Sequence, residues 1–294
     1  MRHIRRNPPG RETRPDFCRI HVLMKPADAR SGNSMSQDIP RDSSLWQESS
    51  FQTTGESRMT GIMDIPRILW IYWRQGEAQA PHVVRLCIAS WRRLNPGWDI
   101  RVLDDASVAQ YADISDVPAH LPPRFHADVL RLRLLARYGG VWTDATTYCH
   151  RPLDGWLPLL AGQTGFFVFG GPYHDRWFDN WFIAAHPDNP LIGRWAENYA
   201  RYARRLTWVP SKYFMMIYIL QWDVLRHRKL WRAFHENGRL PAVGCMILQA
   251  WLENRADLAP FRKVLAAGLP LSKLNWRLSM DDAVIDRAFV EALE

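Results

Sequence analysis

The sequence contains few cysteines, and those it has are far apart. It has four in 294 residues, namely Cys18, Cys87, Cys149 and Cys245. None belongs to a CxxC pair, which argues against a zinc site or a disulfide framework and favours a reducing compartment. The histidines lead to the same conclusion, because His126, His150 and His174 do not have the spacing of metal ligands.

Long hydrophobic runs are also missing. The longest, residues 213–220, is far shorter than the roughly 20 residues that span a bilayer. The arginines near the N-terminus precede no hydrophobic segment, so the sequence predicts no secretory signal. We therefore expect a soluble protein in the cytoplasm, with the inner face of the cell membrane as a peripheral location.

The net charge of +8 does not come from a basic stripe. Its notable local clusters, residues 2–6 and 201–205, are too short for the footprint of a nucleic-acid duplex, so nucleic acid is not an expected partner. Attraction to an anionic membrane or to phosphorylated small molecules remains compatible with this charge.

Composition divides the chain into two parts. Residues 1–60 are rich in Arg, Pro, Ser, Gly and Asp and show no helical or strand period, so we expect a flexible or disordered leader. Residues 61–294 are expected to form one domain. The chain is 47% hydrophobic and 12% aromatic, which is enough to fill a sizeable core.

The ordered pattern begins with an apolar run of strand length at residues 65–73. Residues 82–94 follow with apolar side chains on one helical face, and residues 98–103 form a second strand pattern. A strand, a helix and a strand within about forty residues indicate a βαβ unit with parallel pairing.

The strongest helical pattern covers residues 125–138 and stops at Gly139-Gly140. A short strand, residues 141–143, then delivers Asp144 at its carboxyl end, the edge of an open α/β sheet where ligands bind. Farther on we expect a strand at 165–169, a strand or loop at 273–277, and helices at 195–206, 213–226 and 281–293.

Asp128 and Arg131 stand three residues apart and so share one helix face. By spacing alone, an ordinary helical ion pair explains them. The next segment of the chain favours a functional interpretation, because it contains a Gly-Gly turn and a strand that ends in Asp144-Ala145-Thr146.

These residues form the pattern D-x-x-R, Y-G-G-x-W-x-D-x-T between Asp128 and Thr146. The pattern resembles that of the bacterial capsular polysaccharide synthesis proteins and of the wider group of DXD-motif glycosyltransferases, which includes family 32-like sugar transferases. Further similarity is found at residues 65–70 and 95–98 and at Lys273. The resemblance covers about residues 65–277.

The resemblance implies a GT-A type α/β fold, in which helices flank a mostly parallel central sheet. It also implies transfer of a sugar from a nucleotide-diphosphate donor to a saccharide or lipid-linked glycan in capsule or cell-surface polysaccharide synthesis, with retention of configuration. By the same resemblance, Asp128 and Arg131 contact the donor sugar and Asp144 serves a divalent cation. A hard cation such as Mn²⁺ or Mg²⁺ would neutralise the departing diphosphate.

One position departs from the full DXD pattern. Thr146 stands where a second carboxylate is found in other families, so the cation would have one charged ligand fewer, replaced either by the hydroxyl oxygen of Thr146 or by water.

The remaining candidates for substrate binding lie around this motif. Trp70, Tyr72 and Trp73 end the first strand, where each would either stack on the nucleobase or pack in the core. The other candidates are Gly139 and Gly140 in the motif, Asn180 toward the acceptor or in a structural loop, and Lys273 toward phosphate.

Two other functions fit the same sequence. In the first, the chain is a non-catalytic sugar-nucleotide or glycan-binding protein in which the incomplete motif has lost turnover. In the second, it is a basic peripheral membrane protein attached through residues 1–60.

Overall fold

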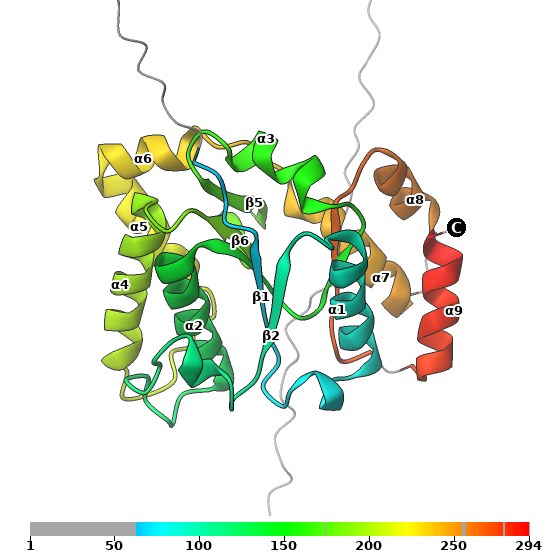
Figure 1. Ribbon diagram of the computed structural model, residues 1–294, viewed down its shortest axis with the longest axis horizontal. Coiled ribbons are helices and arrows are strands. Elements are labelled where there is room, and N and C mark those ends of the chain that lie inside the picture. Colours follow the sequence, from blue (N-terminus) through cyan, green and yellow to red (C-terminus); the bar gives the residue numbers. More distant parts are fainter. Residues whose placement is uncertain (1–62, 174, 255–256, 279, 294) are drawn as a thin grey trace, which may run out of the picture. The chain divides into compact units, whose positions relative to one another are not determined.

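The computed structural model describes residues 63–173, 175–254, 257–278 and 280–293. The expected leader, residues 1–60, lies outside these ranges and stays a prediction. Within the described residues, helices cover both faces of a central sheet (Figure 1). The strands are β1 (Ile68–Tyr72), β2 (Asp99–Leu103), β3 (Gly140–Thr143), β4 (Thr147–Cys149), β5 (Phe166–Tyr173), β6 (Arg176–Ala185) and β7 (Leu271–Lys273). The helices are α1 (His82–Leu94), α2 (Pro123–Tyr138), α3 (Leu157–Ala161), α4 (Pro190–Arg204), α5 (Met215–Arg226), α6 (Arg228–His235), α7 (Ile247–Asn254), α8 (Ala259–Ala266) and α9 (Asp282–Leu293).

The central sheet has five strands in the order β2-β1-β3-β6-β5. Strand β1 pairs in parallel with β2 and with β3, which confirms the expected βαβ unit. Strand β6 is antiparallel to both β3 and β5. The α/β class is therefore confirmed, and the sheet is mixed, because its parallel half continues into an antiparallel hairpin.

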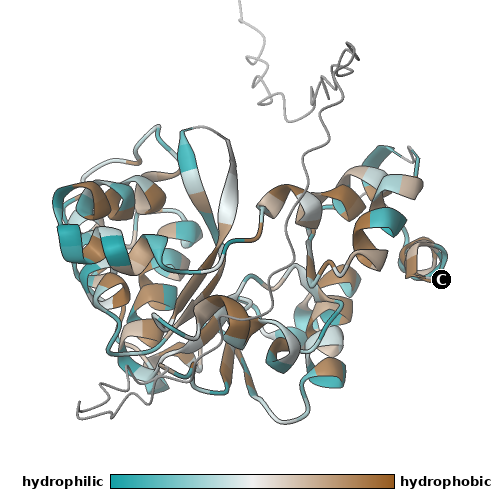
Figure 2. Cartoon of the chain, turned by 90° about the horizontal axis from the view of Figure 1, so that it is seen from above, coloured by the Kyte–Doolittle hydropathy of each residue, from teal (hydrophilic) through white to brown (hydrophobic). Residues whose placement is uncertain are grey.

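Strand β1 contributes to a core on each face of the sheet. Leu69 and Ile71 belong to the core formed with α1, α7, α8 and α9. Trp70 points to the opposite face and packs in the core formed with α2, α4, α5 and α6. Because successive strand residues face opposite sides, one strand serves two cores. In Figure 2 the central part of the sheet is coloured as hydrophobic and lies between helices that carry many hydrophilic residues, whereas the projecting hairpin is largely hydrophilic or neutral.

Helix α2 ends where its sequence predicts, and it begins two residues earlier than expected, at Pro123. Pro123 occupies the first turn, where its missing N–H is no loss. The helix ends at Gly139, whose φ of 66° is a conformation that glycine tolerates. Gly140 also has a positive φ, 92°, and the chain reverses directly into β3. Helix α2 therefore runs back along β3, and its first half lies toward the carboxyl end of that strand.

Strand β6 was not expected from the sequence, although it pairs with β3 in the middle of the sheet. Its first half contains Arg176, Asp179 and Asn180, so it has neither a continuous apolar run nor a regular alternation. The polar residues are accommodated because they cluster where β6 begins, beside the carboxyl end of β3.

Candidate functional site

Three strands of the sheet meet at the edge that the sequence predicted to bind a ligand. Parallel strands β1 and β3 end there, and antiparallel β6 begins there. Thr143, the last residue of β3, is paired with Phe182. The next residue, Asp144, donates its backbone N–H to the carbonyl oxygen of Trp181 at 2.8 Å. Asp144 is thus fixed at the strand end, and 30% of its side chain is exposed to solvent.

A second, two-stranded sheet brings Lys273 to the same place. Strands β4 and β7 pair with Thr147 opposite Lys273. The ammonium Nζ of Lys273 donates a 2.7 Å hydrogen bond to Thr146 Oγ1 and lies 3.6 Å from Asp144 Oδ2. Residues that the sequence separates widely are therefore neighbours at the end of β3.

Helix α2 supplies two further residues of the site, Asp128 and Arg131. Arg131 Nη2 lies 3.2 Å from Asp128 Oδ1, and Arg131 Nη1 lies 3.5 Å from Asp144 Oδ1. Arg131 Nη1 also donates to the carbonyl oxygen of Asn180 at 2.5 Å. The ion pair between Asp128 and Arg131 that spacing alone predicted is present, and Arg131 links it to Asp144.

Burial dominates the electrostatics of Asp128. The pKa of its carboxyl is raised, because burial penalises the charged form more than its neighbours favour it. Arg131 opposes this rise, as does Tyr199, whose Oη donates to Asp128 Oδ2 at 3.0 Å. The partly exposed Asp144 lies between two cations, Arg131 and Lys273. When Asp128, Asp144, Arg131 and Lys273 are all ionised, their charges sum to zero.

Two aromatic residues hold this arrangement in place, and neither was predicted to do so. Trp142 Nε1 donates to Asp144 Oδ1 at 3.3 Å, and the guanidinium of Arg131 lies 4.9 Å from the Trp142 ring centroid. Tyr199 reaches Asp128 from α4. Trp142 stands inside the sequence motif and could have been singled out from it. Tyr199 has no such signal, because only the tertiary fold brings α4 against α2.

The three aromatic residues at the end of the first strand have different surroundings. Trp70 is fully buried and donates from Nε1 to the carbonyl oxygen of Gly139 at 3.0 Å. The core-packing alternative therefore holds for Trp70, since no ring face is left for a nucleobase. Trp73 is partly buried and packs edge-to-face on Trp276 at 5.9 Å.

Tyr72 lies beside an open cavity of about 870 Å³. Its Oη donates to Asp105 Oδ1 at 2.5 Å. The cavity continues along the segment after β2 to His126 in the first turns of α2. It therefore lies between the end of β1 and the helix that carries Asp128, two residues after His126.

Three predicted binding residues have structural roles. Gly139 and Gly140 lie at the start of β3, the opposite end from Asp144, so they do not belong to the site around it. A Cβ on Gly140 would lie 2.3 Å from the Ile68 carbonyl oxygen, and this close approach accounts for the glycine. Asn180 lies at the correct edge, but its Nδ2 is 3.2 Å from Met216 Sδ. Only its backbone carbonyl takes part, as the acceptor from Arg131.

Asp144 and Thr146 offer a divalent cation one carboxylate and one hydroxyl. Mg²⁺ or Mn²⁺ takes about six ligands, largely oxygens. The described residues contain no group of three or more His, Cys, Asp or Glu side chains that could hold a metal. Lys273 and Arg131 also place positive charge beside Asp144. The residues can therefore hold such a cation only together with a ligand that brings further oxygens and negative charge.

The fold and site define an α/β protein with an acid–base cluster at the carboxyl edge of its parallel strands. Residues 37–292 match the model of a family described as capsular polysaccharide synthesis protein. The chain belongs to this family.

Curated relatives match a smaller region. O-glycosyltransferase braB of Annulohypoxylon truncatum is 32% identical over 151 residues, which cover 44% of this chain and 36% of that protein. Glycosyltransferase afumC of Aspergillus fumigatus is 33% identical over 154 residues, which cover 45% and 39%. Inositol phosphoceramide mannosyltransferase 1 of Schizosaccharomyces pombe is 26% identical over 152 residues, which cover 48% and 44%. The chain thus spans less than half the length of these relatives.

Solved structures give weaker matches. A structure described as PaToxG glycosyltransferase aligns with a TM-score of 0.40 and 14% identity, over 58% of this chain and 75% of that one. The apo structure of the bifunctional glycosyltransferase WbbM aligns with a TM-score of 0.45 and 12% identity, over 71% and 46%. These likenesses are too distant to support any assignment of activity.

Proposed function

We propose that the chain is a glycosyltransferase that moves a sugar from a nucleotide-diphosphate donor to a saccharide or lipid-linked glycan in capsule or cell-surface polysaccharide synthesis. Family membership and the names of the curated relatives support sugar transfer. The observation that carries the proposal is the linkage of Asp128, Arg131 and Asp144 through one guanidinium, with Lys273 on the other side of Asp144.

The donor is proposed to lie across the edge of the sheet. Its base occupies the cavity beside Tyr72, which extends to the first turns of α2. Its sugar reaches Asp128, whose carboxylate accepts hydrogen bonds from hydroxyl groups. Its diphosphate lies toward Lys273 and Arg131, which are the cations nearest to Asp144 and suit phosphate oxygens.

The reaction breaks the bond between the anomeric carbon and the diphosphate oxygen, and the electron pair leaves with the diphosphate. An acceptor hydroxyl oxygen forms the new bond to the same carbon and releases its proton to the departing phosphate. Lys273 and Arg131 stabilise the negative charge that grows on the leaving group. We propose transfer on the same face of the sugar, which retains its configuration.

We propose that a divalent cation binds to the site together with the donor. Asp144 and Thr146 would supply two of its oxygen ligands, and phosphate oxygens the others. Bound there, Mg²⁺ or Mn²⁺ would neutralise charge on the diphosphate. Because the four ionised side chains of the site cancel, neither a lone dication nor a lone diphosphate gains strong attraction, whereas the two together neutralise each other.

The test begins with a thermal-shift screen of nucleotide sugars, each with and without Mn²⁺ or Mg²⁺. A donor that raises the melting temperature is then assayed for slow release of nucleotide diphosphate in the absence of acceptor. Turnover by the wild-type chain and its loss in Asp144→Ala would support the proposal. Binding without any turnover would instead identify a sugar-nucleotide-binding protein. With an acceptor in hand, NMR of the product anomer tests retention, and an inverted product would refute same-face transfer.

A further inference from the structure

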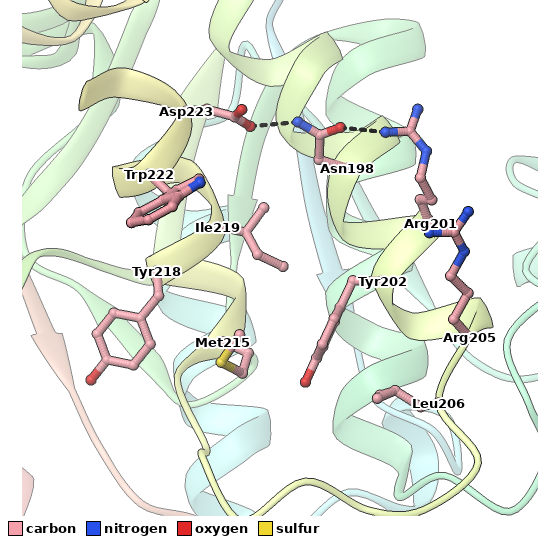
Figure 3. A pocket seen from close by; sticks show the side chains of 10 residues that line it. All are labelled: Asn198, Arg201, Tyr202, Arg205, Leu206, Met215, Tyr218, Ile219, Trp222 and Asp223. Atoms are coloured by element: carbon pink, nitrogen blue, oxygen red, sulfur yellow. Dashed lines mark hydrogen bonds between the residues drawn. The ribbon is translucent and has the colours of Figure 1, made fainter. Parts of the chain in front are cut away.

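A groove of about 690 Å³ runs between α4 and α5 (Figure 3), and none of its lining residues belongs to the acid–base cluster. Its walls carry Tyr202 and Arg205 on one side and Trp222 on the other. Leu206 and Met215 lie toward the same end, where the segment linking the two helices begins and ends, with the ring of Tyr202 between them in this view. The groove is therefore apolar and aromatic toward this end, with guanidinium groups on the α4 side, whereas Asp223, Asn198 and Arg201 form a hydrogen-bonded chain at the other end.

Exposed apolar side chains are concentrated around this groove. Among the described residues, ten large hydrophobic side chains are strongly exposed, and half of them lie between residues 208 and 225. They are Trp208, Val209, Tyr213, Trp222 and Leu225. Trp208 is the most exposed of the five, at 71%. Scattered exposed hydrophobics need no explanation, but five on one helix and the segment before it are a local concentration, and one of them, Trp222, lines the groove itself.

The same surface is strongly basic. Residues 190–226, which span α4, α5 and the segment between them, contain six lysines and arginines but only two acidic residues, Glu197 and Asp223. Asp223 is buried and paired with Arg194. Within the described residues, Arg205 and Lys212 make no ion pair, so their charges are available to an external anion. This part of the chain thus carries +4 of the net charge of +8.

We propose that the surface formed by α4, α5 and the segment between them docks on an anionic lipid bilayer. Tryptophan and tyrosine favour the interface between headgroups and acyl chains, because their rings are apolar with one polar atom. Arginine and lysine add attraction to anionic headgroups, each contributing several-fold in affinity. An apolar groove rimmed by cations has this combination of groups. In the described chain, no helix is both long and apolar enough to span a bilayer.

Docking through this surface places the acid–base cluster beside the membrane. Tyr199 of α4 contacts Asp128, and Met216 of α5 contacts Asn180, so both helices pack directly behind the cluster. The proposal does not depend on sugar transfer. It does give a physical reason for a lipid-linked acceptor, since such an acceptor would be presented at the same bilayer.

The test is sedimentation of the full-length chain with vesicles of phosphatidylcholine alone and of phosphatidylcholine with about one third phosphatidylglycerol. We expect clear binding to the anionic vesicles and at least tenfold weaker binding to the neutral ones, with release at high salt. Trp208→Ser with Trp222→Ser, and separately Arg201→Glu with Arg205→Glu, should each weaken binding to the anionic vesicles by at least about tenfold.

Matched control variants change comparable groups elsewhere. Leu159→Ser removes an apolar side chain that is 85% exposed on α3, and Lys263→Glu with Arg287→Glu reverses charges on α8 and α9. Both controls should bind anionic vesicles like the wild type, and melting temperatures should show that all variants are folded.

Three results would overturn the proposal. The first is no binding to anionic vesicles. The second is binding that Arg5→Glu with Arg6→Glu abolishes while the α4–α5 variants leave it unchanged, because attachment would then depend on the N-terminal segment. The third is a self-association, seen by light scattering without vesicles, that the α4–α5 variants break, because the surface would then be an interface between copies of the chain.

Discussion

Lys273 Nζ donates a 2.7 Å hydrogen bond to Thr146 Oγ1, although 127 positions separate the two residues in the sequence. The bond closes one side of the acid–base cluster and leaves the ammonium 3.6 Å from Asp144 Oδ2. Phosphate oxygens arriving near Asp144 would therefore meet a cation that is already in place. Such preorganised charge is effective where negative charge develops in a reaction.

We predict that Lys273→Met lowers kcat/KM for donor turnover by roughly 100-fold, because it removes one of the two cations beside Asp144. Lys273→Arg keeps the charge in a different shape and should retain part of the activity. Initial rates of nucleotide diphosphate release give both values, with melting temperatures as a check of folding. Wild-type rates in folded Lys273→Met would exclude a role for this ammonium.

Because the charges of the two acids and two bases of the acid–base cluster cancel, we predict that a dication and a diphosphate bind cooperatively. Titration calorimetry of Mn²⁺ alone should give weak binding, and the affinity should rise by at least about tenfold when a nucleotide diphosphate is present. By reciprocity, Mn²⁺ should tighten binding of the nucleotide by the same factor. Asp144→Asn should remove this coupling. Equal nucleotide affinity with EDTA and with Mn²⁺ would show that the protein cations suffice alone.

Tyr199 is predicted to keep Asp128 ionised. Its hydrogen bond favours the carboxylate and opposes the rise in pKa that burial causes. In Tyr199→Phe the pKa of Asp128 should therefore rise further, and the acidic limb of the kcat/KM profile should move to higher pH. Loss of a buried hydrogen bond should also cost about 1 kcal/mol of stability. In the control Tyr111→Phe, the lost hydroxyl makes no hydrogen bond to the described residues, so the pH profile should stay in place.

The partly buried side chain of His150 leads us to predict that the folded protein loses stability at acidic pH. Burial lowers its pKa from 6.5 to about 4, and its Nε2 lies 2.8 Å from Ser272 Oγ. Between these pH values the unfolded chain binds the proton more readily than the folded chain, so stability is complete above pH 6.5 and is lost as the pH falls toward 4. The contribution to the free energy of unfolding should be about 2 kcal/mol smaller at pH 5 than at pH 7.5.

Urea unfolding at the two pH values measures this difference, with His150→Gln as the comparison. Glutamine does not titrate, so the variant should lose less stability on acidification. An equal loss in both proteins would assign the acid sensitivity to other groups.

The sequence predicted those parts of the structure that depend on local pattern. Helix α1 has the expected limits because its apolar positions recur on one face, and Asp144 was correctly placed because a short strand follows a glycine stop. Strand β6 was missed because polar residues at its start break both strand patterns, and only tertiary pairing with β3 explains them. Tyr199 was missed for a similar reason, since nothing in α4 itself indicates which carboxylate its hydroxyl will reach.

A substitution at Gly140 tests whether the Gly139–Gly140 pair has a structural role or a binding role. Its φ is 92°, and a Cβ there would lie 2.3 Å from the carbonyl oxygen of Ile68 on the paired strand. Gly140→Ala should therefore lower the free energy of unfolding by more than about 2 kcal/mol, because both the conformation and the spacing exclude a side chain.

The matched control is Gly193→Ala in α4, where a Cβ meets nothing within 4 Å. It should be neutral or stabilise by up to about 1 kcal/mol, because alanine favours the helix. Urea unfolding gives both stabilities, and nucleotide titration of the folded protein gives the affinity. Since Gly140 lies at the far end of β3 from Asp144, folded Gly140→Ala should bind the nucleotide as the wild type does. A stable variant with lost affinity would instead place the glycine pair in the binding site.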